Sequence, residues 1–475
     1  MGSSRRLSTV SLAVLIAGAV TTSGQAAASP PRLPDAGRAA PNNVNISKQQ
    51  GNQSESTIAI NQTNPLQMTV VSNEESIAGL FHGWTTDGGR TWSTDVIADG
   101  DSLGIACCDP SLASDNHGNI FLTWLSSNIQ VLVAISTNGG ASFTKIATIS
   151  AGAPARGPAP GRGPGRLPGG DQPSIVAAMD SVWVTYTANN GNIVAQGASV
   201  PGLGQVGQFG PQETPNAGHK TGDYGDVAIG PSGQVLIAWQ DPTGGEGPAT
   251  IYQAFDPDGL GPQAMGPATP VLVSNVGGFD YIPAQRGRSV DVEVKLEYDR
   301  TGGAHAGRVY LLWTQEVGNE SDDMDIMVQF SDNDGSNWST AVRVNGDTGT
   351  NSQFNPRISL DPTTGFLAVA WYDARNDLGD HGRGDTNGRP NDDAMIYGSF
   401  TKDGGLTFAA NRRISKGVSN AAQANNFIDY GDYEGLAFYG GAYFYVWADN
   451  SNSTGDNPNG TLNQLDIYTA RVRVA

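Results

Sequence analysis

Acidic side chains recur in the chain where short apolar segments begin or end, and carboxylates grouped in this way can donate and accept protons. Those that precede a segment are Asp109, Asp171, Asp223 with Tyr224, Asp291, Asn355 with Arg357, and Asp432 with Tyr433 and Glu434. Those that follow one are Asn73 and Glu74, Asn189, Asp241, Glu316, Asp373 with Arg375, and Asp449. The same pattern is expected of side chains that only cap the backbone of a turn. A copy that departs from the pattern is therefore more informative than the pattern itself.

Two copies depart from it. The last, DYGDYEGLAF (429–438), places Glu434 beside Tyr433, and Tyr430 in the preceding loop is an alternative phenol. The sixth alone carries Arg357 and Arg375, whose guanidinium groups can hold a carboxylate through two parallel hydrogen bonds. We expect Asp109, Tyr433 and Glu434 to be catalytic. The residues expected to contact a substrate are Asp171, Tyr224, Arg357, Asp373, Arg375, Tyr430, Asp432 and the two cysteines.

Cys107 and Cys108 are the only cysteines, and they are adjacent, directly before Asp109. A bridge between neighbours is strained, because consecutive Cα atoms lie about 3.8 Å apart and disulfides prefer roughly 4.4–6.8 Å. It also closes almost no loop and therefore stabilises the fold little. Two buried thiols are the alternative. We favour a vicinal disulfide that forms a stiff apolar platform beside Asp109.

Repeated strand pairs predict the architecture. Each unit is a short strand, a turn and an apolar strand that usually ends in Trp, as in DPSLASDNHGNIFLTW (109–124) and NPRISLDPTTGFLAVAW (355–371). Seven such units, at spacings of roughly 45–75 residues, predict an all-β, seven-bladed β-propeller, with six blades as the alternative. The last unit lacks one strand, and NNVNIS (42–47) is free to supply it and close the ring.

A recurring turn carries a family resemblance. It reads Ser/Thr, any residue, Asp/Asn, any residue, Gly, two residues and an aromatic, in TTDGGRTW (85–92), STNGGASF (136–143), SDNDGSNW (331–338) and TKDGGLTF (401–408). This pattern resembles the Asp-box, or bacterial neuraminidase repeat, of the sialidase superfamily. The resemblance implies a propeller whose Asp-box turns join the third and fourth strands, on the face away from the active site.

It also implies a secreted glycoside hydrolase of exo-sialidase type acting on a glycan. Such enzymes use a tyrosine nucleophile with a glutamate, an aspartate acid/base and three arginines that hold the substrate carboxylate. Asp109, Tyr433 or Tyr430, Glu434 and Arg357 match parts of that set. The family's early Arg-Ile-Pro is replaced by STIAINQ (56–62). A non-catalytic glycan- or protein-binding propeller without the arginine triad is therefore the alternative.

Two insertions interrupt the units. Residues 151–170 hold Arg156, Arg162 and Arg166 among Gly and Pro, which indicates a surface loop or a basic lip for an anionic glycan. Residues 373–393 are rich in Asp and Gly, so their oxygens could bind Ca²⁺, although the spacing matches no EF-hand loop. No other cofactor is expected.

The N-terminus predicts export. Arg5 and Arg6, the largely apolar run 7–20 and the small residues before Ala28 are typical of a signal peptide over 1–28, followed by a linker over 29–41 and the propeller over 42–475. The expected mature protein is extracellular, monomeric and without a membrane span. A net charge of −19 disfavours nucleic acid as a partner.

Overall fold

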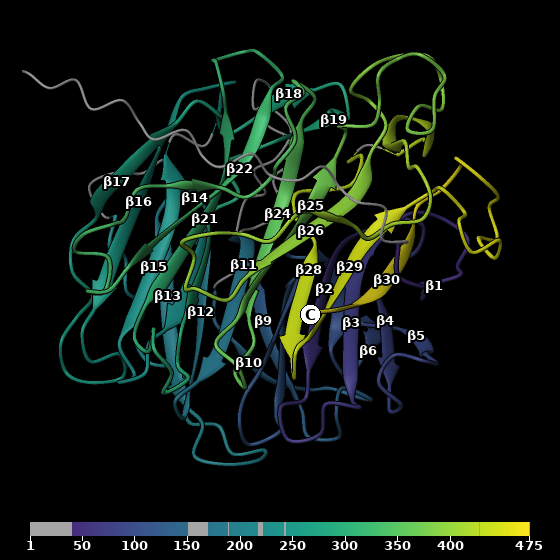
Figure 1. The fold of residues 1–475 in the computed structure, drawn as a ribbon. Helices are drawn as coiled ribbons and strands as arrows, with labels where there is room; N and C mark the ends of the chain where they lie inside the picture. The colour runs from purple at the N-terminus through teal and green to yellow at the C-terminus, as the bar shows by residue number, and fades with distance from the viewer. Residues whose placement is uncertain are drawn as a thin grey trace, which may run out of the picture.

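Seven small sheets surround a central channel in the computed structural model, and Figure 1 shows their strands. The structure describes residues 40–150, 170–188, 190–216, 222–241, 244–426 and 428–474. Within them the only helical element is the 3₁₀ turn η1 (Ala421–Gln423), and no helix could span a membrane. The predicted seven-bladed β-propeller is confirmed, and the six-bladed alternative is wrong. Residues 1–39 and 151–169, which hold the expected signal peptide, most of the linker and the basic lip, lie outside the described residues, as does Asn189.

The first three blades follow one another along the chain. Blade 1 comprises β2 (Gln53–Ile60), β3 (Met68–Glu74), β4 (Leu80–Thr85) and β5 (Ser93–Ile97). Blade 2 comprises β7 (Gly104–Ser114), β8 (Ile120–Ser126), β9 (Val131–Ser136) and β10 (Thr144–Thr148), with the short β6 (Asp99–Asp101) added beside β7. Blade 3 has three strands, β11 (Gly170–Ala178), β12 (Ser181–Ala188) and β13 (Ile193–Ser199).

Blades 4 to 6 have four strands each. Blade 4 comprises β14 (Asp223–Ile229), β15 (Val235–Asp241), β16 (Ala249–Asp256) and β17 (Thr269–Ser274). Blade 5 comprises β20 (Lys295–Tyr298), β21 (Val309–Glu316), β22 (Met324–Ser331) and β23 (Val342–Arg343). Blade 6 comprises β24 (Gln353–Leu360), β25 (Leu367–Asp373), β26 (Met395–Thr401) and β27 (Arg412–Arg413). Between blades 4 and 5 the chain forms a separate hairpin, β18 (Asp280–Ile282) and β19 (Gln285–Val290).

Blade 7 closes the ring with both ends of the chain. Its strands are β28 (Gly435–Tyr439), β29 (Ala442–Asp449), β30 (Asp466–Arg473) and the N-terminal β1 (Asn43–Asn45). β1 pairs antiparallel with β30, with Val44 opposite Thr469, as expected from the sequence. The pairing leaves blade 7 with its fourth strand and joins the two ends of the domain.

The core lies between neighbouring blades. Second strands contribute the largest fully buried side chains, among them Trp124, Trp183, Trp239, Trp371 and Trp447. Such rings bury large apolar areas and fill the space between twisted sheets. The sequence pattern of an apolar strand ending in Trp therefore indicates side chains that pack between blades.

The four recurring turns join third and fourth strands, as the family resemblance implied. In the first turn, Asp87 Oδ1 accepts hydrogen bonds from the N–H groups of Arg90 and Thr91 at 2.9 and 3.0 Å. Asp403 accepts the N–H of Thr407 in the same way at 3.0 Å. These side chains satisfy the backbone of a tight turn, so their role is structural.

The inner strands begin with an irregular residue that is important for the site. Register shifts interrupt the first pairs of β2, β7, β11, β14 and β24. Within these shifts the backbone takes a left-handed φ at Glu55, Asp109, Gln172, Tyr224 and Asn355. A bulge re-aims a side chain. All these bulges lie at the same end of the channel, which we call the mouth.

The closing strand generates a stability prediction. Asn45 donates a side-chain hydrogen bond to the buried Asp466, and burial raises the pKa of Asp466 to about 7. Asn45→Ala should lower the free energy of unfolding by about 1–3 kcal/mol, because a buried acceptor loses its partner. Urea unfolding measures this effect. The control is Asn42→Ala, which removes only an exposed contact with Lys416 and should leave stability unchanged; equal stabilities for both variants would contradict the prediction.

Candidate functional site

Blades 1, 2 and 7 are joined at the mouth by one hydrogen-bond network. Asn73 donates its side-chain N–H to Glu55, and its Oδ1 accepts the N–H of Asp109 at 3.0 Å. Glu55 Oε1 in turn accepts the N–H of Asp432 at 3.1 Å. Gly431 stands where a Cβ would lie 2.3 Å from Glu55 Cγ, so glycine is required for this approach. The three acidic side chains are thus brought together by backbone as well as side-chain contacts.

Blade 3 adds the residue that links two of these carboxylates. The backbone N–H of Gln172 donates to Asp109 Oδ2 at 3.1 Å, and its side-chain amide donates to Asp432 Oδ2. Asp171, next in sequence, shares a side-chain hydrogen bond with Asp109. Asp109 and Asp432 therefore lie within reach of a single glutamine. We use the name mouth cluster for four carboxyl groups and one arginine: Glu55, Asp109, Asp171, Asp432 and Arg288. The contacts of Arg288 are described in the next paragraph.

Arg288 brings a cation to these carboxylates from outside the blades. It lies on the β18–β19 hairpin, and its Nε and one terminal nitrogen donate to the two carboxylate oxygens of Asp432. Asp429 accepts the N–H groups of Gly287 and Arg288 at 2.6 and 3.1 Å. Gln285 donates to the Gly431 carbonyl at 2.8 Å. The loop before blade 7 thus holds the hairpin in the position that aims Arg288 at Asp432.

Burial dominates the electrostatics of the mouth cluster. Glu55, Asp109, Asp171 and Asp432 are each less than 9% exposed. Burial, followed by the charge of Asp432, raises the pKa of Asp109 to about 6. Burial also raises the pKa values of Glu55 and Asp171 well above their usual range, while Arg288 opposes each increase. The cluster can therefore hold a proton at mildly acidic pH and donate it.

Several further residues lie near the mouth cluster. Tyr433 lies beside the cluster, with its hydroxyl donating to the Pro110 carbonyl at 3.3 Å, and burial next to Glu55 and Asp109 raises its pKa. The pKa of the buried Tyr224 is raised by burial and by Asp432. Asp291 and Glu293, at the start of blade 5, are buried with Lys295, which lies 2.9 Å from Glu293. These residues extend the acidic surroundings toward blades 4 and 5.

Glu434 has different surroundings from Tyr433. It accepts hydrogen bonds from the hydroxyl of Tyr372 at 2.7 Å and the N–H of Ala448 at 3.1 Å, and also from Ser56 Oγ. Tyr433 and Glu434 lie in the segment directly before β28, and their side chains have different partners. Glu434 thus belongs to the buried contacts between blades 6, 7 and 1.

Tyr430, Asp373 and Arg375 have local partners. The Tyr430 ring stacks on Tyr372, with centroids 4.3 Å apart. Arg375 donates to both oxygens of Asp373 and packs on the Tyr397 ring. The pair Asp373 and Arg375 thus stabilises blade 6, and Tyr430 packs on blade 6 from the loop before blade 7. None of these contacts joins the mouth cluster.

Arg357 lies inside the channel below the mouth. The channel has a volume of about 340 Å³ and is lined by inner strands of all seven blades. Arg357 faces Glu293 and Tyr433 electrostatically from this position. Its charge is therefore directed to the underside of the mouth.

The two cysteines form the predicted vicinal disulfide, and the described residues contain no free cysteine. Cys107 is exposed, and Cys108 is partly buried against the apolar residues between blades 2 and 3. The disulfide therefore presents one face to solvent directly before Asp109.

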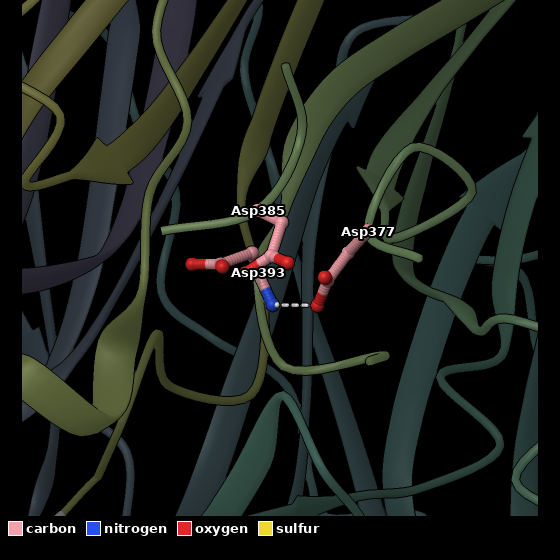
Figure 2. Close-up of side chains that lie close together, drawn as sticks. All are labelled: Asp377, Asp385 and Asp393. Atoms are coloured by element: carbon pink, nitrogen blue, oxygen red, sulfur yellow. Dashed lines mark hydrogen bonds between the residues drawn. The ribbon is translucent and has the colours of Figure 1, made fainter. Parts of the chain in front are cut away.

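A separate group of carboxylates lies in the insertion that was expected to offer oxygen ligands. One oxygen each from Asp377, Asp385 and Asp393 lies within 4.8 Å of the others (Figure 2). Asp377 Oδ2 also accepts the backbone N–H of Asp393 at 2.9 Å, as Figure 2 shows. These three residues could hold a divalent cation, since carboxylate oxygens are its preferred ligands.

Three mouth residues were not predicted from the sequence. Glu55 and Gln172 occupy the same left-handed position as Asp109, so aligning the bulges rather than the acidic residues would have found them. Arg288 lies in a hairpin outside the repeat, and its only sequence signal is the interruption between units 4 and 5.

Two predictions follow from these contacts, the first for the disulfide. Thiol titration of the denatured protein without reductant should detect no free thiol, and reduction should release two and raise the mass by two hydrogens. Detection of two reactive thiols before reduction would contradict the bridge.

The second concerns Glu434, whose pKa is raised by burial from 4.5 to about 8. The folded protein therefore binds more protons than the unfolded chain between these values, and this group makes stability fall as pH rises through that range. Glu434→Gln keeps an acceptor for Tyr372 and places an amide N–H where Ser56 Oγ can accept it, and it should reduce the fall. Thermal melting between pH 4 and 9 measures it. The exposed Asp99→Asn is the control. Parallel pH profiles for wild type and Glu434→Gln would contradict the assignment.

Comparisons with known proteins find similarity to solved structures, and none in sequence. No protein-family model matches the chain, and no curated protein matches its sequence. Among solved structures, the phage phi92 endosialidase is 10% identical, with 92% of this chain and 69% of that chain covered, at a TM-score of 0.47. The α-L-arabinanase of Penicillium chrysogenum is 14% identical, with 70% and 94% covered, at 0.45. Polysaccharide lyase Uly1 is 9% identical, with 88% and 90% covered, at 0.46. At these identities and scores, no function is transferred from them.

Proposed function

We propose that this chain is a glycoside hydrolase that acts at the mouth cluster. The observation that supports it is the pair Asp109 and Asp432, which share Gln172 as a hydrogen-bond donor but have different partners. Burial and the nearby Asp432 raise the pKa of Asp109 to about 6. Asp432 accepts two hydrogen bonds from the guanidinium of Arg288. Glycosidases use one carboxyl group that donates a proton and a second that stabilises the developing charge or activates the attacking group.

The proposed roles follow from these surroundings. Asp109 donates a proton to the leaving oxygen of the glycosidic bond, and Asp432 stabilises the positive charge that develops on the sugar or activates the attacking group. Arg288 is a positioning residue, because it acts through Asp432. Its charge also offsets part of the repulsion among the buried carboxylates. The vicinal disulfide would form an apolar surface beside the proton donor.

We propose a neutral glycan as the substrate. The mouth cluster offers no unpaired positive charge to an anionic sugar, because its one arginine, Arg288, is already engaged by Asp432. Arg357 lies on the channel side. Of the three arginines expected of a sialidase, only one, Arg288, lies in the mouth cluster among the described residues.

One observation favours a sialidase-like mechanism as the second candidate. Tyr433 lies beside Glu55 and Asp109, and a tyrosine, a glutamate and an aspartate are the residue types such a mechanism uses. Glu55 would then take the place expected for Glu434. Export would be part of either function, and a disulfide in the chain supports an oxidising compartment.

Asp109→Asn tests the proposal. Hydrolysis of a panel of neutral aryl glycosides, arabinan and sialosides should identify a substrate, and the variant should lower kcat by about 100-fold or more, as expected for a lost proton donor. Wild-type activity should also decline above about pH 6, where Asp109 loses its proton. The exposed Asp99→Asn is the control, with thermal melting to confirm folding.

The outcomes separate the candidates. Loss of activity in Asp432→Asn with activity retained in Tyr433→Phe supports the carboxylate pair. The reverse result, with sialosides as substrates, supports the tyrosine mechanism. No hydrolysis of any substrate would reject both and favour a non-catalytic binding propeller.

A further inference from the structure

An open groove lies beside the mouth, outside the cluster already described. Its volume is about 560 Å³, within the range of sites that bind small molecules. One wall is the β18–β19 hairpin and the other is formed by two loops of blades 5 and 6. The lining residues are Tyr281, Ile282, Pro283, Arg286, Asp322, Arg389, Pro390 and Asp392.

The groove shares its hairpin with the mouth cluster. In this hairpin Asp280 pairs with Val290 and Ile282 pairs with Gln285, so Tyr281 and Arg288 belong to one short two-stranded unit. Tyr281 and Arg286 line the groove, whereas Arg288 reaches Asp432. A chain-like ligand with one unit at Asp432 would therefore have its next units directed along the hairpin. Figure 1 shows β18 and β19 together at one end of the propeller.

The groove offers the contacts that a sugar needs. Tyr281 is 40% exposed, and an accessible aromatic ring can pack against the apolar face of a sugar while its hydroxyl stays in solvent. Arg286 donates to Asp392 at 3.1 Å, and the Asp392 side chain is only 1% exposed. Fixed polar groups beside an aromatic ring can bind hydroxyl groups in a defined orientation.

Its charges are balanced, which indicates a neutral occupant. Arg286 and Arg389 oppose Asp322 and Asp392, so the four charged lining residues sum to zero. An anionic or a cationic chain would gain little net attraction here.

The wall opposite the hairpin is held in place. Asp377 Oδ2 accepts the N–H groups of Asp392 and Asp393 at 2.8 and 2.9 Å, and Leu378 bridges to Pro390. The groove is therefore formed before any ligand arrives, which lowers the entropy that binding must offset.

We propose that this groove is a subsite for a further sugar unit of a neutral linear oligosaccharide whose reacting bond lies at the mouth cluster. The proposal rests on the proposed function and deepens it: the substrate is a glycan chain, gripped beyond the reacting unit, rather than a single terminal sugar. Tyr281 is the residue that determines the preference for a chain.

Calorimetric titration with linear arabino-, xylo- and gluco-oligosaccharides, from disaccharide to hexasaccharide, tests it in an Asp109→Asn background that prevents turnover. Affinity should increase with chain length. Adding Tyr281→Ala should weaken binding of the longer chains by about ten-fold, the loss expected of an aromatic contact at a binding centre. Tyr281→Phe should restore it, because the ring is kept. Leu406→Ala, an exposed apolar residue in the β26–β27 turn of blade 6, is the control and should bind like the parent.

Equal affinity of the Tyr281→Ala variant and its parent would overturn the subsite, as would affinity that does not depend on chain length. Hydrolysis of small aryl glycosides by the wild type without binding of any oligosaccharide would overturn the subsite and leave the proposed function standing. Absence of both binding and hydrolysis would overturn both. A melting temperature within about one degree of the parent's confirms that each variant is folded.

Discussion

The ion pair between Arg288 and Asp432 is the contact on which the mouth depends. A propeller brings the beginnings of its inner strands to one place, and in this chain those positions carry acidic residues from several blades. Burying an ionised carboxylate costs several kcal/mol unless it is paired and hydrogen-bonded. Arg288 supplies the charge, and Asn73 and Gln172 supply donors. Without a cation at this point, further carboxyl groups would have to take up protons for the same packing to persist.

The source of that cation connects distant parts of the chain. Arg288 comes from the hairpin between blades 4 and 5, whereas the loop that holds the hairpin precedes blade 7. Blade 7 also contains β1 from the N-terminus. The contact therefore adds a bond across the mouth to the bonds that close the ring, and both involve blade 7 or the loop before it.

The fold could be predicted from the sequence because its signals are repeated. Each unit carries its own turn, and most second strands contain a tryptophan, so a weak signal in one unit is supported by the others. The closing strand was predictable because an incomplete last blade leaves an edge that needs a partner.

The site was predictable only in part, since Asp109 and Asp432 follow the repeat but Arg288 does not. Glu434 was expected to act with Tyr433, yet its carboxylate accepts the hydroxyl of Tyr372 instead. Sequence adjacency does not decide where a side chain points, and Glu55 and Gln172 are found only when the units are aligned on the bulge position rather than on their acidic residues.

The protonation of the mouth links its stability to its proposed chemistry. Asp109, Glu55 and Asp171 have pKa values raised by burial, so the folded protein holds protons there that the unfolded chain releases. The contribution of these groups to stability is complete below their unfolded pKa values, near 4, and is lost as pH rises through the folded values, near 6 for Asp109. A proton donor needs the same protonated form. The pH range in which these groups contribute most to stability is therefore also the range in which Asp109 carries the proton that it donates. Burial by the surrounding blades causes both effects. The charged residues that line the groove beside Tyr281 sum to zero, so a neutral sugar chain could bind there without changing the protonation of the mouth cluster.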